Sequence, residues 1–224
     1  MSVKLISYTV PNLELFEAGI ENMQELVAYC ARVSNPDNQL NTKTSEGLVN
    51  YLIKHKHWSP LEMVSVCVEI NTTRDIARQI LRHRSFTFQE FSQRYADPSV
   101  SLGFEIRECR LQDYANRQNS IEATDQSLIE WWKWAQEEVV DVVQDIYTQA
   151  LRRGIAKEVA RAILPEGLME TRIYMNGTLR SFIHYCQLRS GVETQKEHRE
   201  IALDCVDAIA GEFPAIKGLC NDSE

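Results

Sequence analysis

The sequence from residue 82 to residue 95 reads Arg82-His83-Arg84-Ser85-Phe86-Thr87-Phe88-Gln89-Glu90-Phe91-Ser92-Gln93-Arg94-Tyr95. No other part of the chain packs so many potential anion-binding groups together. The wider window 73–95 holds five arginines against two acidic residues, a local charge of +3 in a chain whose net charge is −8. This reversal predicts a site for a small anionic molecule, because arginine's planar fork can hold a phosphate in a bidentate manner.

The periodicity of this region changes near residue 84. Apolar residues between 76 and 81 have helical spacing, and a basic stripe at four-residue intervals runs from Arg74 to Arg82. The alternating aromatic pattern that follows predicts a strand on which Glu90, Ser92 and Arg94 share one face. A solvated arginine face followed by an edge strand is the alternative interpretation of the same pattern.

Length and composition favour one sizeable domain, residues 1–224, in a cytosolic protein. Apolar residues make up 44% of the chain and charged residues 25%, which suits a packed soluble domain. The net charge of −8 argues against a duplex DNA binder. The N-terminal residues lack a signal-peptide pattern, and no apolar run is long enough to span a bilayer.

The cysteines and histidines do not predict a metal site or a disulfide framework. Six cysteines are scattered without a C-x-x-C pair, and none lies between residues 82 and 95, so we expect buried thiols. His55 and His57 stand two residues apart beside Pro60, but no third ligand follows at a typical spacing.

The pattern along the whole chain predicts an α+β fold in which helices flank a mixed or antiparallel sheet. Strands are expected at 3–10, 64–70, about 84–95 and 169–175, an extended stretch at 100–110, a loop at 111–124 and a turn at Asn176-Gly177. Helices are expected at 14–33, 44–55 with Thr44 as a candidate N-cap, 74–82, 125–153, 157–164, 178–189 and 194–209. The helix at 125–153 is apolar on so much of its surface that it should be buried in the core or against another subunit.

The segment 82–94 resembles the signature of the flavin-dependent thymidylate synthases, which is Arg-His-Arg, two residues, Ser, one residue, Asn, two residues, Ser, one residue, Arg. Thr87 replaces the first serine and Gln89 the asparagine, and both changes keep the hydrogen-bonding type. Flanking blocks also resemble the family: His57, Ser59, Pro60 and Glu62 match the histidine, hydroxyl residue, proline and glutamate of one block, and residues 160–165 resemble Ala-Arg-x-x-Leu-Pro. Glu193 stands where the family commonly has histidine, whereas the residues at 195 and 197 fit again.

The resemblance implies an enzyme, a methyltransferase that converts deoxyuridylate (dUMP) to deoxythymidylate. Methylenetetrahydrofolate would supply the carbon, and FAD reduced by NADPH would supply the hydride. It also implies a homotetramer with sites shared between subunits. The residues assigned to dUMP are Gln79, Arg82, Glu90, Ser92, Gln93, Arg94, Arg161 and Arg189. Those assigned to FAD are Ser59, Arg82, His83, Arg84, Glu90, Thr178, Arg180 and His184, and the residues on the folate side are His57 and Glu62.

In the mechanism that the resemblance implies, Arg189 stabilises uracil ionised at N3, and no cysteine acts as a nucleophile. Two other interpretations stay open. One is a single-strand nucleic-acid binder with Phe86, Phe88 and Phe91 as stacking platforms, which the acidic net charge disfavours. The other is an inactive family member, because of the changes at Thr87, Gln89 and Glu193.

Overall fold

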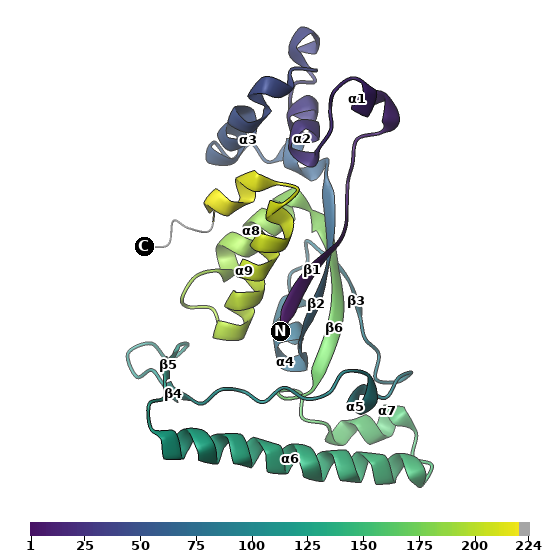
Figure 1. Cartoon of the computed structure of the whole chain (residues 1–224), viewed down its shortest axis with the longest axis vertical. Helices are drawn as coiled ribbons and strands as arrows, with labels where there is room; N and C mark the ends of the chain where they lie inside the picture. The colour runs from purple at the N-terminus through teal and green to yellow at the C-terminus, as the bar shows by residue number, and fades with distance from the viewer. Residues whose placement is uncertain (220–224) are drawn as a thin grey trace.

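A four-stranded antiparallel sheet forms the centre of the computed structural model, which describes residues 1–219 (Figure 1). Its strand order is β1 (Ser2–Tyr8), β2 (Ser65–Thr73), β6 (Glu170–Thr178) and β3 (Thr87–Glu90). β2 and β6 pair along their whole length, from Ser65 opposite Thr178 to Thr73 opposite Glu170. Alternate residues of β2 are buried, so the period of two in its sequence turns one face of the sheet towards the core.

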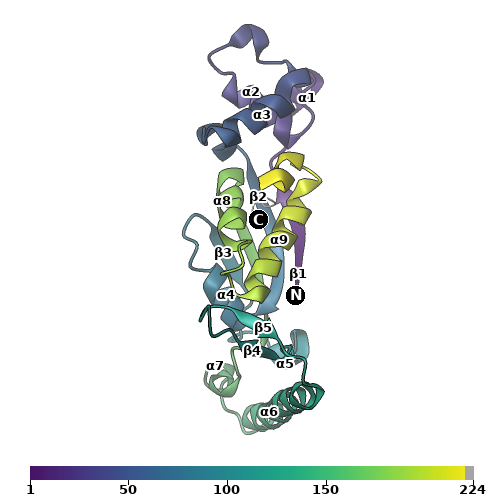
Figure 2. The ribbon, with the colours of Figure 1, turned by 90° about the vertical axis from the view of Figure 1, so that its left-hand side faces the viewer.

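Three helices cover that buried face. They are α4 (Arg74–Ile80), α8 (Leu179–Arg189) and α9 (Lys196–Ala210), and Figure 2 shows all three in front of the sheet. Their apolar faces, such as Ile76 on α4, Phe182 on α8 and Ile201 on α9, join the main core and are fully buried. Each such side chain contributes roughly 1.5–3 kcal/mol by leaving water. The predicted α+β architecture with an antiparallel sheet and flanking helices is confirmed.

One end of the molecule is a small helical lobe made of α1 (Leu13–Glu17), α2 (Met23–Ala31) and α3 (Ser45–Lys54) (Figure 1). The prediction of one helix over 14–33 is wrong, because the chain turns at Gly19 with φ +92° and Asn22 starts a new helix by capping Glu25. Thr44 precedes α3 but does not cap it, since its hydroxyl accepts a hydrogen bond from Arg32 instead. Three 3₁₀ turns complete the lobe, Pro36–Asn38, Thr42–Thr44 and Ser59–Glu62.

The opposite end is a layer built on the long helix α6 (Gln126–Arg152) and the short helix α7 (Lys157–Ala160), with a 3₁₀ turn at Arg161–Ile163. Asp125 caps α6, and Gly154 follows its end with φ +83°. A second, smaller core joins this layer to the sheet through Tyr147, Ala160, Leu164 and Met169. The predicted long helix is confirmed within a residue at each end.

Most of the apolar surface of α6 is exposed in the single chain, so of the two expected environments the chain's own core is excluded and burial against another subunit stays a prediction. Only Gln136 and Tyr147 of this helix are buried. The exposed fraction of the side chain is 56% for Trp134 and 54% for Val142. The other exposed apolar residues of α6 are Trp131, Trp132, Val139 and Ile146.

The secondary structure between residues 84 and 124 differs from the prediction. β3 ends at Glu90, and Ser92 starts a turn in which its carbonyl accepts from the amides of Tyr95 and Ala96, so Ser92 and Arg94 are not on a strand with Glu90. Residues 100–110 are not extended throughout, because the short helix α5 (Pro98–Ser101) and Gly103 with φ +117° interrupt them. The predicted loop 111–124 contains a hairpin of β4 (Arg110–Gln112) and β5 (Ser120–Glu122).

Asn176-Gly177 is part of β6 and not a turn, which corrects the prediction for this dipeptide. Gly177 serves a close approach, because a Cβ there would lie 2.5 Å from Cδ1 of Phe86. The chain ends its described part in a 3₁₀ segment, Pro214–Leu219. No helix within residues 1–219 combines the length and the apolar character that crossing a bilayer requires.

Candidate active site

Helix α4 presents a basic face to the end of strand β3. Glu90 lies 3.3 Å from Nη1 of Arg74 and 3.4 Å from Nη1 of Arg78, and it also accepts a hydrogen bond of 3.3 Å from Thr171. Glu166 lies 3.7 Å and 3.6 Å from the same two arginines. The basic stripe predicted from the sequence is therefore a structured arginine pair and not a freely solvated face. Burial lowers the pKa of Arg74, and Glu90 works against that shift.

A pocket of about 390 Å³ opens beside this pair. Gln93 lies in it with only 4% of its surface exposed, and its Nε2 has no hydrogen-bond partner within residues 1–219. Leaving a buried donor unpaired costs about 1–3 kcal/mol, so the arrangement fits a ligand that accepts a hydrogen bond. The pocket is lined by Arg74, Arg78, Gln93, Glu158, Arg161, Ala162, Leu164 and Glu166.

Ser92 and Arg94 stand at the rim of this region. The hydroxyl of Ser92 accepts a hydrogen bond of 3.4 Å from the amide of Arg94. The guanidinium of Arg94 lies 3.5 Å from Glu158, and both side chains are exposed. Ser92 and Glu90 also line a neighbouring cavity of about 400 Å³ on the open face of the sheet. Five predicted dUMP residues, Glu90, Ser92, Gln93, Arg94 and Arg161, thus gather at one place.

A second group lies between α4, α8 and α9. Arg189 ends α8, and its Nε donates to Nε2 of His83 over 3.0 Å. Burial, with Arg189 and Arg82 nearby, lowers the pKa of His83, which suits a ring nitrogen that accepts. Within residues 1–219 the two terminal nitrogens of Arg189 make no hydrogen bond, so a planar pair of donors remains for a ligand. Gln79 donates to Gln195 over 2.8 Å.

Several of the predicted flavin and folate residues lie where α8 meets the 3₁₀ turn Ser59–Glu62, whereas Glu90 and His83 belong to the two groups described above. Arg180 pairs with Glu62, and the ring of His184 lies edge-on to Trp58 with centroids 4.5 Å apart. Burial, then the nearby Arg180, lowers the pKa of His184. Thr178 caps α8 by accepting from the amide of Ser181.

Three residues of this set make fewer contacts. Ser59, His57 and Arg84 are exposed, and the ring of His57 lies near those of Tyr51 and His55, with centroids 5.9 Å and 6.3 Å away. Arg84 makes no ion pair in the described part of the chain, and neither does Arg82. Unpaired guanidinium groups, a hydroxyl and an imidazole N–H are donors that suit a dinucleotide with a pyrophosphate.

The structure does not bring all predicted dUMP residues together. No hydrogen bond or ion pair within residues 1–219 directly joins Gln79, Arg82 or Arg189 to the group around Gln93. Sequence reasoning also left two lining residues out of the predicted site, Arg74 and Arg78. Their signal was present, because the four-residue spacing placed them on the same stripe as Arg82.

None of the described cysteines lines the pocket beside Gln93, whereas Cys186 lies on α8 one turn before Arg189. Cys186 and Cys205 are buried, and Cys30, Cys67 and Cys109 are half-buried. Burial raises the pKa of the thiols of Cys30, Cys67 and Cys205, which reduces the thiolate that nucleophilic attack requires. Cys220 lies outside the described residues. No cluster of three or more metal-ligating side chains is found within residues 1–219.

Comparisons with known proteins agree on one family. Residues 14–215 match the family model described as thymidylate synthase complementing protein. A probable flavin-dependent thymidylate synthase of Paramecium bursaria Chlorella virus 1 is 49% identical over 216 residues, which cover 96% of this chain and 97% of the relative. A flavin-dependent thymidylate synthase of Synechocystis is 47% identical with the same coverage.

Among solved structures, a UMP/dUMP methylase, PolB from Streptomyces cacaoi bound with 5-Br dUMP, has the same fold. Its TM-score is 0.79, with 22% identity, and the match covers 99% of this chain and 95% of that one. The family model spans most of the chain, and two relatives of matching length are nearly half identical to it. The chain therefore belongs to the thymidylate synthase complementing protein family, the methyltransferase family of the flavin-dependent thymidylate synthases.

Proposed function

We propose that residues 1–224 form a single catalytic domain of a cytoplasmic enzyme that converts dUMP to deoxythymidylate. The carbon donor is methylenetetrahydrofolate, and FAD reduced by NADPH is the cofactor. The observation that carries the proposal is the pocket in which Arg74, Arg78 and Arg161 surround the unpaired amide of Gln93. Those groups match the charge and hydrogen-bonding needs of a nucleotide phosphate, and they lie beside the family signature.

The group around Gln93 and the group around Arg189 bind opposite ends of the nucleotide. The phosphate binds at Ser92, Gln93, Arg94 and Arg161, and the uracil ring lies at Gln79, Arg82 and Arg189. The phosphate displaces Glu158 from Arg94, since that ion pair is exposed and weak. Because no direct contact links the groups within one chain, the proposal includes a homotetramer in which neighbouring subunits complete each site. The exposed apolar stripe of α6 supports such assembly.

Arg189 is the proposed catalytic residue. Methyl transfer to C5 needs an electron-rich uracil, and a cation at the ring stabilises the negative charge of uracil ionised at N3. Arg189 is suited to this because Nε is bonded to His83 while both terminal nitrogens stay available. No cysteine is assigned a nucleophilic role, in keeping with the buried or half-buried positions of the described thiols.

FAD is held by Ser59, Arg82, His83, Arg84, Glu90, Thr178, Arg180 and His184, with His57 and Glu62 on the folate side. When bound and reduced, FAD supplies the hydride that completes the methyl group. The protein's own contribution is to bind, orient and polarise. Arg180 must exchange Glu62 for the cofactor, or hold both in an extended network.

The decisive experiment combines a spectrum with a turnover assay. Purified protein loaded with FAD should show bound flavin absorbance that bleaches on adding NADPH. With dUMP and methylenetetrahydrofolate it should then form deoxythymidylate. Flavin binding without product would favour an inactive family member. No FAD binding with or without dUMP, together with binding of single-stranded nucleic acid, would support the stacking interpretation instead.

A further inference from the structure

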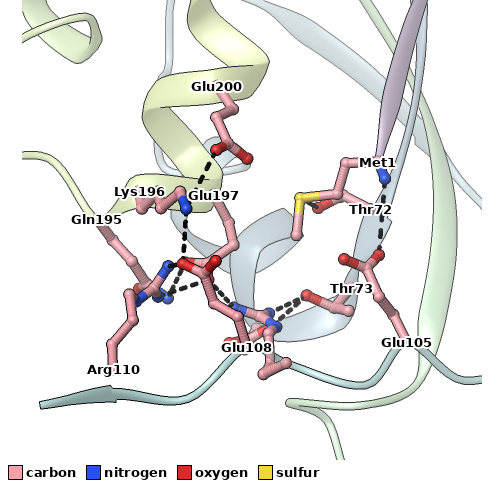
Figure 3. Close-up of polar contacts among 12 residues, drawn as sticks. Met1, Thr72, Thr73, Glu105, Glu108, Arg110, Gln195, Lys196, Glu197 and Glu200 are labelled. Atoms are coloured by element: carbon pink, nitrogen blue, oxygen red, sulfur yellow. Dashed lines mark hydrogen bonds and ion pairs between the residues drawn. The ribbon is translucent and has the colours of Figure 1, made fainter. Parts of the chain in front are cut away.

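A chain of hydrogen bonds links the buried residues Glu197 and His198 through Gln195 and Gln79, which are half-buried, beneath the proposed uracil end of the site. Glu197 accepts from Nε2 of Gln195 over 2.9 Å, and Oε1 of Gln195 accepts from Nε2 of Gln79 over 2.8 Å. Oε1 of Gln79 lies 3.3 Å from Nδ1 of His198, and Nε2 of His198 lies 3.1 Å from the hydroxyl of Tyr185. Figure 3 shows the start of this chain, where Gln195 and Arg110 meet Glu197.

The direction of every bond in the chain follows from the carboxylate at its end. Glu197 lies 2.5 Å from Arg110 and 3.2 Å from Arg107. Burial acts to raise the pKa of Glu197, but a backbone hydrogen bond, Arg107, Gln195 and Arg110 outweigh it, and the pKa is lowered. An ionised carboxylate can only accept hydrogen bonds. Gln195 must therefore turn its NH₂ group towards Glu197.

The remaining orientations are then forced one by one. Because the amide of Gln195 gives its NH₂ to Glu197, its oxygen faces Gln79, which must turn its own NH₂ that way. The oxygen of Gln79 is left facing Nδ1 of His198, and an oxygen needs a donor there. His198 is fully buried and its ring is neutral, because burial, Arg189 and His83 lower its pKa to about 3. One proton on Nδ1 leaves Nε2 to accept from Tyr185.

We propose that His198 is a positioning residue whose Nδ1–H tautomer fixes the amide of Gln79 in a single orientation towards the nucleotide. The proposal rests on the function proposed above, in which Gln79 contacts the uracil end of dUMP. Fixing the amide leaves Gln79 with one free N–H and one free lone pair at defined places. If the amide of Gln79 flipped, its NH₂ group would face the Nδ1–H of His198. Two donors would then oppose each other, and the lost hydrogen bond would destabilise the flipped orientation.

The tautomer can be measured directly. In the FAD-loaded protein labelled with ¹⁵N histidine, His198 should show a protonated Nδ1 and an unprotonated Nε2 at pH 7. The five histidines of the chain make assignment practical, with the His198→Asn spectrum identifying the missing pair of signals. A protonated Nε2 on His198 would overturn the proposal.

Two amide variants of His198 distinguish a positioning role from a packing role. His198→Asn can place an NH₂ where Nδ1 lies, whereas His198→Gln can place its amide where Nε2 lies. With calorimetric titration of dUMP into the FAD-loaded protein, we expect a Kd within about threefold of wild type for His198→Asn. For His198→Gln we expect binding about tenfold weaker, the loss of roughly one directed hydrogen bond.

Each result of this comparison decides the proposal. Equal weakening in both variants, or wild-type affinity in both, would overturn the directional role of Nδ1. Flavin content and thermal midpoint are measured alongside, since a packing defect would change them in parallel with Kd. If the wild-type protein itself fails to bind dUMP, the proposed function is refuted together with the ligand of Gln79. The tautomer measurement would still decide whether the hydrogen-bond chain has the stated direction.

Discussion

At the residue scale, Arg189 is where the chemistry can be tested most directly. Its Nε is occupied by His83 while its terminal nitrogens are free. We expect Arg189→Ala to lower the rate of deoxythymidylate formation by about 10²–10³, the usual loss on removing one electrostatic stabiliser. Arg189→Lys should recover only part, because a point charge cannot replace a planar fork.

Measuring both half-reactions on the same variant provides the control for Arg189. NADPH oxidation by the flavin does not need ionised uracil, so it should survive better than product formation. Wild-type rates of deoxythymidylate formation by Arg189→Ala at saturating dUMP would show that the residue is only structural.

The buried ring of His198 also predicts a pH effect on stability. Its pKa falls from the usual 6.5 to about 3 on folding, so below pH 6.5 the unfolded chain binds a proton that the folded chain does not. For each unit by which the pH is lowered below 6.5, this group alone should therefore reduce the free energy of unfolding by about 1.4 kcal/mol. Urea unfolding between pH 7 and 5 tests this, above the range in which Glu197 takes up its proton.

The matched variants for this titration are His198→Asn and His55→Asn. The first should flatten the pH dependence, and the second, at an exposed histidine, controls for the loss of one imidazole. The lowered pKa values of His83 and His184 act in the same direction, so a residual slope is expected. An unchanged slope in His198→Asn would contradict the prediction.

At the scale of elements, the contact between β6 and Phe86 can be tested at Gly177. A Cβ there would meet the ring of Phe86 at 2.5 Å and 2.9 Å, so Gly177→Ala should destabilise the fold by about 1–3 kcal/mol through overpacking. Gly47→Ala in α3 has open space around the new methyl group and should stabilise by about 0.5–1 kcal/mol. Chemical denaturation of the two variants checks both signs.

The same glycine shows where sequence patterns stop being informative. Asn176-Gly177 predicts a turn because this dipeptide tolerates positive φ, yet here the missing side chain makes room for an aromatic ring from a distant segment. Only the assembled sheet reveals that partner. The long helix α6 and the strand β2 were predictable because their periods are sustained over many residues. The helix expected at 14–33 failed at one glycine within an otherwise helical pattern.

At the scale of the whole molecule, the exposed stripe on α6 predicts the state of association. Val142→Glu places a charge among exposed apolar side chains and should shift the protein from the proposed tetramer towards smaller species in light scattering. Gln144→Glu adds the same charge at another exposed position of α6 and should leave the mass unchanged. Because the proposed sites are shared, Val142→Glu should also lose dUMP binding as it dissociates.

The candidate site could be predicted from the sequence only in part. The family resemblance assigned Gln93, Arg94 and Arg161 to the same ligand, and the structure brings them to one region. The sequence did not reveal that Gln79 and Arg189 gather elsewhere, because a linear motif says nothing about which helix face meets which neighbour. Nor did it reveal the hydrogen-bond chain through His198, whose partners come from α4, α8 and α9 together.

Strand β6 restricts where residues can be inserted into this chain. It pairs with β2 on one side and β3 on the other, Met169 before it packs in the second core, and Thr178 at its end caps α8. One inserted residue would turn Ile173 or Met175 away from the core and rotate the start of α8. Insertions between β4 and β5, where residues 114–118 are exposed, disturb no such register. Changes in chain length should thus be tolerated at that hairpin and excluded from β6.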